Sequence, residues 1–430
     1  MTHMLSAAVI AFVLFASIFG SAEHSDLDEI LLGGVKDRVY PGAIGLVGNL
    51  DGILYTNPVG RHSYNHNDTT TKVNTLFDLA SLTKVVSTTS AVSLMYQNGY
   101  LQLDTVISSV LGDKFNNGGK DNITVLNCLL HNAGFAPDPV PWYWDPSFGC
   151  PNTDDEFPAQ DFSCLNSMIY DSFLSETLVT PPGEAFVYSD LSFITLQMVV
   201  GTLVLEHKLV PPTEMSTCLS LTSRRSTLNS DSLAASTAPR PQQIVCAFEA
   251  FVRTEVFHRP APDATTQTDT HSFNKAWMPS TTYLPAESRW PTCMPTLNDT
   301  GAGSYTHKRL QGQVADGDCY AMGGIAGHAG VFSTATDVAT LAQYLLSKAV
   351  EDTTSVASNT AAKNAATAVG VEMESSQQEG VPASRSTLPF LNATTVKLFS
   401  TVYNTTQSSR ALGWSTNTPL VSDKCTFIVL

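Results

Sequence analysis

The spacing of hydrophobic residues predicts a chain of strands and buried helices interrupted by long polar segments. At the amino end, helical spacing over Leu27 to Val39 predicts a short amphipathic helix. Its buried face would carry Leu27, Ile30, Leu31 and Val35.

Two short apolar stretches after this helix predict a β-hairpin. Ala43 to Gly48 and Ile53 to Val59 have the length and composition of strands. Asn49-Leu-Asp-Gly52 between them is a typical hairpin turn. The chain therefore begins with a helix and two paired strands.

Four longer stretches predict helices. Val85 to Tyr96 and Leu191 to Leu205 carry no charged residue, which is typical of buried helices, and Gly99 is placed to end the first of them. Ile244 to Phe257 and Thr336 to Leu346 also have helical periodicity. With the hairpin, these helices predict a mixed α/β (α+β) protein.

Two segments lack any such periodicity. Residues 207–243 are rich in Ser, Thr and Pro, and residues 351–386 are mostly polar or alanine-rich. Both predict loose surface insertions.

The composition restricts the range of partners. The 430 residues are 43% hydrophobic and 14% charged, which is typical of a globular protein, and the net charge is −16. There is no cluster of Lys or Arg, so we expect neither nucleic acid nor an anionic membrane surface as a partner.

The first 22 residues predict a signal peptide. They contain no Asp, Glu, Lys or Arg, Leu5 to Phe19 is apolar, and Gly20-Ser-Ala22 supplies the small residues that precede a cleavage site. The mature domain would then span 23–430. The alternative is an uncleaved membrane anchor, because Met4 to Ala22 is long enough to cross a bilayer.

Cysteines and glycosylation sequons agree with export. All eight cysteines lie beyond the leader, and their even number suits disulfides. Five Asn-x-Ser/Thr sequons occur, at Asn67, Asn122, Asn298, Asn392 and Asn404. We therefore expect a secreted protein, or one in the lumen of the secretory pathway.

The candidate chemistry begins at Ser81 and Lys84, which stand three residues apart at the start of the first buried helix. At this spacing both side chains share one helical face. A serine hydroxyl needs a base to become a nucleophile, and a lysine in an apolar setting can be that base. A second Ser-x-x-Lys, Ser272 to Lys275, lies in a polar stretch without an apolar face.

Tyr188 and Asp190 are the next candidates. Tyr-x-Asn/Asp occurs three times, and Tyr188-Ser-Asp190 is the copy that lies on a loop just before a buried helix. A tyrosine there could accept the serine proton and pass it to a leaving group. The alternative is an ordinary core tyrosine at a helix start.

Metal and cofactor chemistry find no support. The ten histidines form no His-Glu-x-x-His, and the Cys/His spacings are not those of metal ligands. The glycine run at Gly323 to Gly330 lacks the Lys-Ser/Thr of a phosphate loop. We expect no cofactor.

Three blocks together carry a family resemblance. They are Phe77-Asp-Leu-Ala-Ser81-Leu-Thr-Lys84, then Pro182-Gly183 with Tyr188-Ser-Asp190, and Gly323-Gly-Ile-Ala-Gly-His328-Ala-Gly330-Val-Phe-Ser. In this order they closely resemble the beta-lactamase-related serine hydrolases. That group includes class C beta-lactamases, penicillin-binding proteins, D-aminopeptidases and esterases.

The resemblance implies the beta-lactamase/transpeptidase-like fold. An antiparallel sheet from 27–60 and 387–430 would be flanked by helices, with a helical and loop part inserted between. Ser81 would be the acylated nucleophile, Lys84 its base and Tyr188 the general acid/base. Asp190 stands where many members have Asn and would be a supporting contact. The substrate would be a small-molecule or peptide-like ester, amide or lactam.

One element of the family pattern is missing. The family has Lys/His-Thr/Ser-Gly on a strand near its carboxyl end, which helps to form the oxyanion hole. No such triplet occurs in residues 415–430, although Cys425 to Leu430 predicts a strand. The resemblance therefore implies truncated C-terminal strands and an exposed sheet edge. His328-Ala-Gly330 has suitable residue types, but it lies elsewhere in the family order and is not expected to substitute.

Three hypotheses follow for function. The chain is an active serine hydrolase, a non-catalytic family member that serves as a ligand-binding or scaffold protein, or an incomplete fragment that does not fold alone.

Overall fold

The computed structural model describes residues 24–148, 165–220, 239–259, 277–298, 309–351, 390–403, 408, 410–414 and 426–429. The predicted signal peptide and the second Ser-x-x-Lys lie outside these residues, as does nearly all of the predicted insertion at 351–386.

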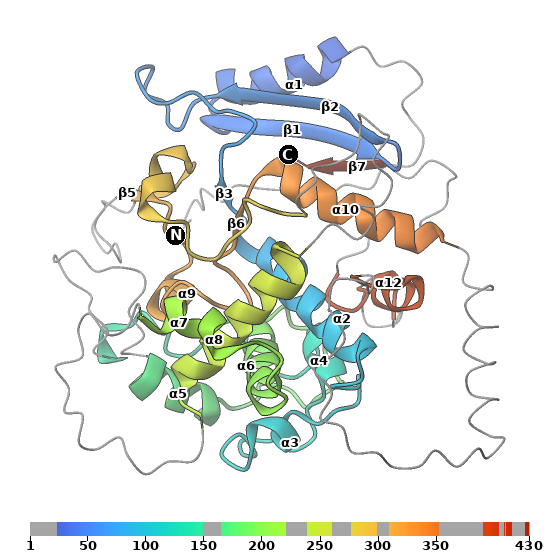
Figure 1. Ribbon diagram of the computed structural model, residues 1–430. Helices are drawn as coiled ribbons and strands as arrows, with labels where there is room; N and C mark the ends of the chain where they lie inside the picture. The colour runs from blue at the N-terminus through green and yellow to red at the C-terminus, as the bar shows by residue number, and fades with distance from the viewer. Residues whose placement is uncertain are drawn as a thin grey trace.

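The elements lie in two layers, a sheet with its covering helices and a larger helical part (Figure 1). The helices are α1 His24–Lys36, η1 Ala80–Leu82, η2 Lys84–Thr89, α2 Ser90–Gln97, α3 Ile107–Leu111, α4 Val125–Leu129, η3 Pro146–Phe148, η4 Leu165–Ile169, α5 Tyr170–Ser175, α6 Asp190–Glu206, α7 Pro212–Ser220, α8 Pro241–Phe251, η6 Val252–Phe257, η7 Glu287–Thr292, α9 Gly317–Ala321, α10 Ala335–Val350 and α12 Ala393–Ser400. The strands are β1 Gly42–Asn49, β2 Gly52–Gly60, β3 Phe77–Asp78, β4 Pro295–Asn298, β5 Arg309–Gln311, β6 Phe332–Ser333 and β7 Thr426–Val429.

The main sheet has the order β2-β1-β7, with antiparallel pairing throughout. The predicted hairpin is therefore confirmed, and so is the strand at the carboxyl end. The expectation of an exposed sheet edge is wrong for part of β1, because Leu46 pairs with Val429 and Asn49 pairs with Thr426. One C-terminal strand thus closes half of this edge.

Strand β1 is buried on both faces, so it does not alternate between apolar and polar residues. Ile44 and Leu46 face the main core, while Val47 faces a small cluster beneath α1. Helix α1 covers one face of the sheet and α10 the other, as Figure 1 shows.

Helix α1 confirms the predicted amphipathic helix, with one correction. Leu27, Leu31 and Val35 pack on the sheet. Ile30 was expected to be buried with them, but 68% of its surface is exposed. Val47 and the ring of Tyr55 fill the cluster beneath the helix, so Ile30 remains at its outer edge.

Helix α6 is the centre of the helical part. It is apolar all round, and its contacts with α2, α3, α4 and α8 bury most of its length. The long apolar stretch without an amphipathic face had predicted this burial. Among the described residues, no helix combines the length and the hydrophobicity that a bilayer span requires.

The first predicted insertion is partly wrong. Residues 212–220 form helix α7, which packs on α8. A disulfide joins Cys218 on α7 to Cys246 on α8, and this link was not readable from the sequence. Not every cysteine is paired as expected, since Cys128, Cys293 and Cys319 are buried free thiols.

Removal of this disulfide should lower stability measurably. The loop that it closes spans 28 residues, for which the chain-entropy model gives about 3.5 kcal/mol. We expect Cys218→Ser with Cys246→Ser to lower the free energy of unfolding by about 2–4 kcal/mol in urea titration. Cys128→Ser is the control for cysteine replacement alone. An unchanged urea midpoint in the double variant would show that α7 is not held by this link.

Candidate active site

Ser81 lies on the short turn η1, directly after strand β3. Ala80 before it has a φ of 46°, a left-handed conformation that residues other than glycine rarely adopt. The Asp78 carboxylate supports this turn, because its Oδ1 accepts the Ala80 N–H at 2.9 Å. The Ser81 side chain is exposed on the outside of the turn, where a substrate can reach it.

Asp78 also ties the turn to the segment before α9. Its Oδ2 accepts the Ala315 N–H at 3.0 Å. Burial raises the pKa of Asp78 to about 6, although both N–H bonds favour the carboxylate. Above that pH the ionised side chain holds Ser81 in register with the segment that supplies Asp316.

Lys84 is the buried partner of Ser81. Its Nζ donates to Ser81 Oγ at 2.8 Å, although the residue is only 2% exposed. The same Nζ lies 2.7 Å from Asp190 Oδ1 and donates to the His328 carbonyl at 3.4 Å. The Asp190 contact is an ion pair without good hydrogen-bond alignment. A buried lysine with one contact to a serine hydroxyl is suited to proton transfer.

The start of α6 places Tyr188 and Asp190. Ser189 caps this helix, since its Oγ accepts the Ser192 N–H at 3.4 Å, and its own hydroxyl donates to the Ala136 carbonyl at 2.7 Å. Asp190 is the first residue of the helix and turns inward to Lys84. Tyr188 remains 40% exposed beside it.

The Tyr188 ring is packed between aromatic and cationic groups. It stacks on His131 with a centroid distance of 4.5 Å, and Lys84 Nζ lies 4.7 Å from its centroid. The Arg410 guanidinium lies 5.5 Å away. Burial, and then the charges of Arg410 and Lys84, hold the pKa of His131 well below its usual range, so its ring is neutral. Its Nδ1 then accepts the Ser189 N–H at 3.0 Å.

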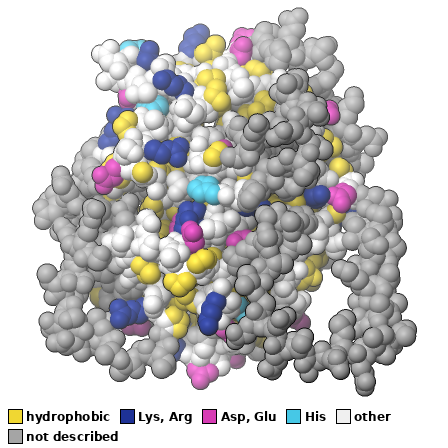
Figure 2. Space-filling model, viewed as in Figure 1, with side chains coloured by type: hydrophobic (Ala, Val, Ile, Leu, Met, Phe, Trp, Pro, Cys, Tyr) yellow, Lys and Arg dark blue, Asp and Glu magenta, His cyan; other side chains and the backbone are white. Residues whose placement is uncertain are grey.

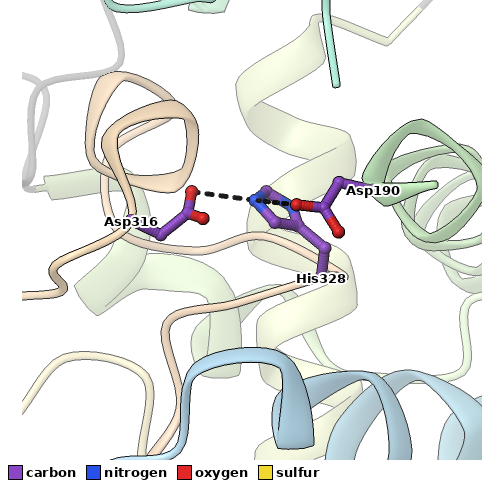
Figure 3. Close-up of side chains that lie close together, drawn as sticks. All are labelled: Asp190, Asp316 and His328. Carbon is purple, nitrogen blue, oxygen red and sulfur yellow. Dashed lines mark hydrogen bonds and ion pairs between the residues drawn. The ribbon is translucent and has the colours of Figure 1, made fainter. Parts of the chain in front are cut away.

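Behind Lys84 lies a charged network formed by Asp190, Asp316 and His328, which Figure 3 shows. The His328 side chain is fully buried; its Nε2 lies 2.9 Å from Asp316 Oδ1 and 4.0 Å from Asp190 Oδ2. Burial acts to lower the pKa of His328, but Asp316 and Asp190 outweigh it and raise that pKa. Burial raises the pKa of Asp316, but the charge of His328 and its hydrogen bond outweigh this effect and lower that pKa to about 2.

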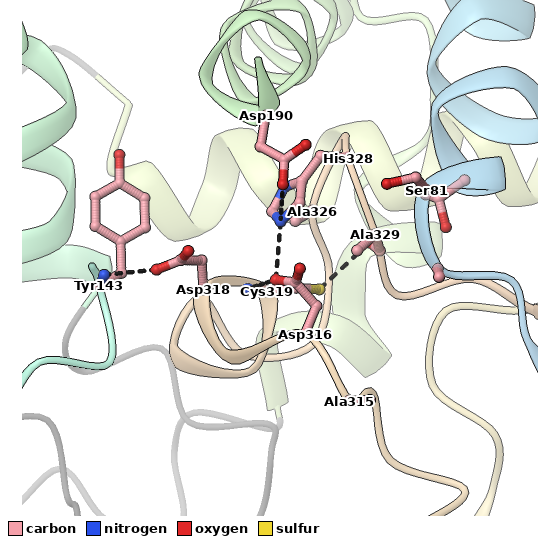
Figure 4. A network of polar contacts seen from close by, with 12 residues as sticks. Ser81, Tyr143, Asp190, Ala315, Asp316, Asp318, Cys319, Ala326, His328 and Ala329 are labelled. Carbon is pink, nitrogen blue, oxygen red and sulfur yellow. Dashed lines mark hydrogen bonds and ion pairs between the residues drawn. The ribbon is translucent and has the colours of Figure 1, made fainter. Parts of the chain in front are cut away.

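Figure 4 shows Ser81 at one side of this network and Asp318 at the other. Asp318 Oδ1 accepts the Tyr143 N–H at 2.6 Å. Burial and the nearby Asp316 charge raise the pKa of Asp318 to about 7. The network thus extends from the exposed serine to the loop around Tyr143.

Asp190, Asp316 and His328 each offer a metal-ligating atom within 4.8 Å of the others. Carboxylates with imidazole suit several transition metals. The Lys84 ammonium, however, already lies 2.7 Å from Asp190. We therefore interpret the cluster as an ion-pair network and not as a metal centre.

The glycine run brings His328 into this position. A Cβ at Gly327 would lie 2.1 Å from the Phe193 carbonyl oxygen, so no side chain fits against α6. The Gly327 N–H donates to Gln197 Oε1 at 2.9 Å, and its carbonyl accepts from Thr88 Oγ1 at 2.6 Å. These contacts fix the backbone next to His328 between α6 and η2.

The structure brings the four residues predicted from the sequence together. Ser81, Lys84 and Asp190 are in direct contact through the lysine, and Tyr188 places its ring beside Lys84. The His328 side chain is fully buried.

The sequence reasoning missed Asp316, His131 and Arg410. They come from three separate segments, and none stands in a recognisable motif. A signal did exist for Asp316, because it precedes a short helix as a capping residue and accepts the Cys319 N–H at 2.8 Å.

Part of the chain is similar to known proteins. Residues 27–203 match the family model described as Beta-lactamase. The similar curated proteins include a "Putative D-alanyl-D-alanine carboxypeptidase" of Salmonella agona (strain SL483), 24% identical over 280 residues, which covers 64% of this chain and 51% of that protein. Its counterpart in Salmonella schwarzengrund (strain CVM19633) is 25% identical over the same length. The chain spans about half the length of these relatives.

Two solved structures are also similar. The octameric penicillin-binding protein homologue from Pyrococcus abyssi is 14% identical with a TM-score of 0.45, covering 75% of this chain and 56% of that one. A class C beta lactamase from Rhodobacter sphaeroides is 15% identical with a TM-score of 0.43, covering 74% and 65%. The region that matches the Beta-lactamase family model contains Ser81, Lys84, Tyr188 and Asp190.

Proposed function

We propose that the protein is a serine hydrolase that cleaves an ester, amide or lactam through an acyl-enzyme on Ser81. The observation that carries this proposal is the 2.8 Å contact between the buried Lys84 Nζ and the exposed Ser81 Oγ. It combines an accessible nucleophile with a base that is shielded from water.

In the proposed reaction, neutral Lys84 takes the Ser81 proton as Oγ attacks the carbonyl carbon. The tetrahedral intermediate collapses when a proton reaches the leaving group, and Tyr188 is proposed to transfer it. Water then releases the acyl group by the reverse sequence. The N–H of Ser81 is proposed as one donor to the oxyanion.

The similar curated proteins are named as D-alanyl-D-alanine carboxypeptidases, which indicates the first substrates to test. We propose peptides that end in D-alanyl-D-alanine as the first class to test, followed by lactams and simple esters. The Arg410 guanidinium beside Tyr188 supports a substrate that carries a carboxylate.

We propose that the protein works outside the cytosol. The Cys218–Cys246 disulfide supports an oxidising compartment. Asn67 and Asn122 of the predicted sequons are exposed, whereas Asn392 caps helix α12. In Figure 2 the coloured Lys and Arg side chains lie scattered among acidic and apolar ones, which gives no support to a nucleic-acid surface on that face.

A fluorophosphonate probe tests the proposal directly. We expect the full chain to gain the mass of one probe, and peptide mapping to place that mass on Ser81. Failure of a sample with a cooperative thermal transition to take up probe, D-alanyl-D-alanine peptide or penicillin would favour a non-catalytic binding protein. Absence of any cooperative transition would favour the fragment hypothesis.

A further inference from the structure

Four ionisable side chains alternate in charge behind Ser81. Lys84 lies 2.7 Å from Asp190, Asp190 lies 4.0 Å from His328, and His328 lies 2.9 Å from Asp316. The four come from η2, α6, the glycine run and the N-cap of α9. Two carboxylates are therefore shared between one ammonium and one imidazole.

The Asp190 carboxylate creates a difficulty for catalysis. A carboxylate at 2.7 Å favours the charged form of a lysine, whereas a general base must be neutral. A second cation beside the same carboxylate offsets this preference, because it weakens the field that Asp190 exerts on Lys84. His328 is in that position.

The surroundings of His328 favour its charged form. Asp316 from the α9 N-cap and Asp190 from α6 face it most closely, and Lys84 from η2 opposes them. Asp318 on α9 and Asp138 on the loop before η3 interact with His328 electrostatically, and burial raises the pKa of each carboxyl group. The two carboxylates closest to His328 come from two elements other than the one that carries it, so the imidazolium is stabilised from two sides.

Asp316 also has contacts besides the one with His328. Its side chain is 31% exposed to solvent, and it accepts the Cys319 N–H at 2.8 Å. On the His328 ring, Nδ1 has no hydrogen-bond partner among the described residues, so the polar contacts of the ring all lie on its Nε2 side.

We propose that the Asp316–His328 pair is a built-in counter-charge that shares the Asp190 carboxylate with Lys84 and so determines how readily Lys84 accepts the Ser81 proton. His328 and Asp316 are thus positioning residues and do not touch the substrate. This inference rests on the proposed function of Ser81 and Lys84.

The test is the pH dependence of labelling by a fluorophosphonate probe. In His328→Gln the Asp190 field acts on Lys84 alone, so Lys84 holds its proton more tightly. We expect the acid limb of the labelling rate to move up by about one pH unit, with labelling about tenfold slower on the acid side. In His328→Gln with Asp316→Asn the charge balance is restored, so the acid limb of the labelling rate should lie close to its wild-type position.

This rescue separates an electrostatic role from a structural one. If the pair were merely structural, the double variant would be labelled as slowly as His328→Gln, or more slowly. The inference is overturned if folded His328→Gln keeps the wild-type acid limb, or if the double variant does not regain the wild-type labelling rate. In either case, labelling of the wild type still supports the proposed function. Loss of wild-type labelling with EDTA and recovery with Zn²⁺ or Mn²⁺ also overturns the inference, in favour of a metal centre.

A measurement on the wild-type protein does not depend on activity or on a variant that folds. Imidazole ¹⁵N shifts of the full chain should show His328 more than half protonated at pH 6.5. The resonance is assigned by its absence in His328→Gln, or in His328→Asn if the first variant does not fold. A neutral His328 ring at pH 6.5 overturns the inference whether or not Ser81 is labelled, whereas an unlabelled wild type with a protonated ring defeats the proposed function alone.

Discussion

Ser81→Ala is expected to abolish labelling by the fluorophosphonate probe and turnover of any ester, amide or lactam substrate. The hydroxyl is the only atom removed, and no other group at this position could form the acyl-enzyme. Because Ser81 is exposed and its hydroxyl accepts one hydrogen bond from Lys84, its loss should change stability by only about 1 kcal/mol. The variant should therefore lose labelling while its thermal unfolding stays close to that of the wild type.

The chain supplies a matched control for this substitution. Ser272 belongs to the second Ser-x-x-Lys, so Ser272→Ala removes the same hydroxyl from the same short pattern. We expect this variant to label at the wild-type rate. If Ser81→Ala were still labelled and Ser272→Ala were not, the assignment of Ser81 as the nucleophile would be wrong.

Lys84→Met should slow labelling by about a thousandfold, within the usual range for loss of a general base. Methionine keeps the apolar stem in the buried space and removes only the group that contacts Ser81 Oγ at 2.8 Å. The rate of probe uptake by intact mass spectrometry measures the effect. A normal rate in this variant would mean that another group activates the serine.

The control for Lys84→Met is Lys72→Met. Lys72 is an exposed lysine twelve residues upstream, outside the contacts described around Ser81. Its labelling rate is expected to stay within about twofold of the wild type. Lys84→Met also removes the ion pair with Asp190 and leaves His328 at 4.0 Å from that carboxylate, so a loss of stability is expected beside the kinetic one.

Much of the fold follows from local pattern. The hairpin of β1 and β2, the buried helix α6 and the amphipathic α1 were predicted because each has a periodicity or turn residue that acts over a few positions. Ile30 was misplaced because the pattern gives one apolar face but not how wide a surface the sheet offers to it. Helix α7 was missed because its composition is polar, and its packing depends on Cys246 from another segment.

The residues of the site likewise divide into those that a local pattern predicts and those that only the fold brings together. Ser81 and Lys84 could be paired from the sequence because three residues on one turn fix their separation. Tyr188 and Asp190 came from a motif and its place before a buried helix. Asp316 and His328 could not be placed next to Asp190 without the fold, because their 2.9 and 4.0 Å contacts depend on how the glycine run passes between α6 and η2.

The pairing of β1 with β7 has a consequence for the order of folding. Leu46 and Val429 meet in one sheet although nearly the whole 430-residue chain separates them. During synthesis the amino-terminal strands therefore emerge long before their partner, while the helices around α6 have their contacts within reach. We expect the helical part to form first and the sheet to close last. The edge of β1 is then exposed in the nascent chain, at the stage when a chaperone would protect it from aggregation.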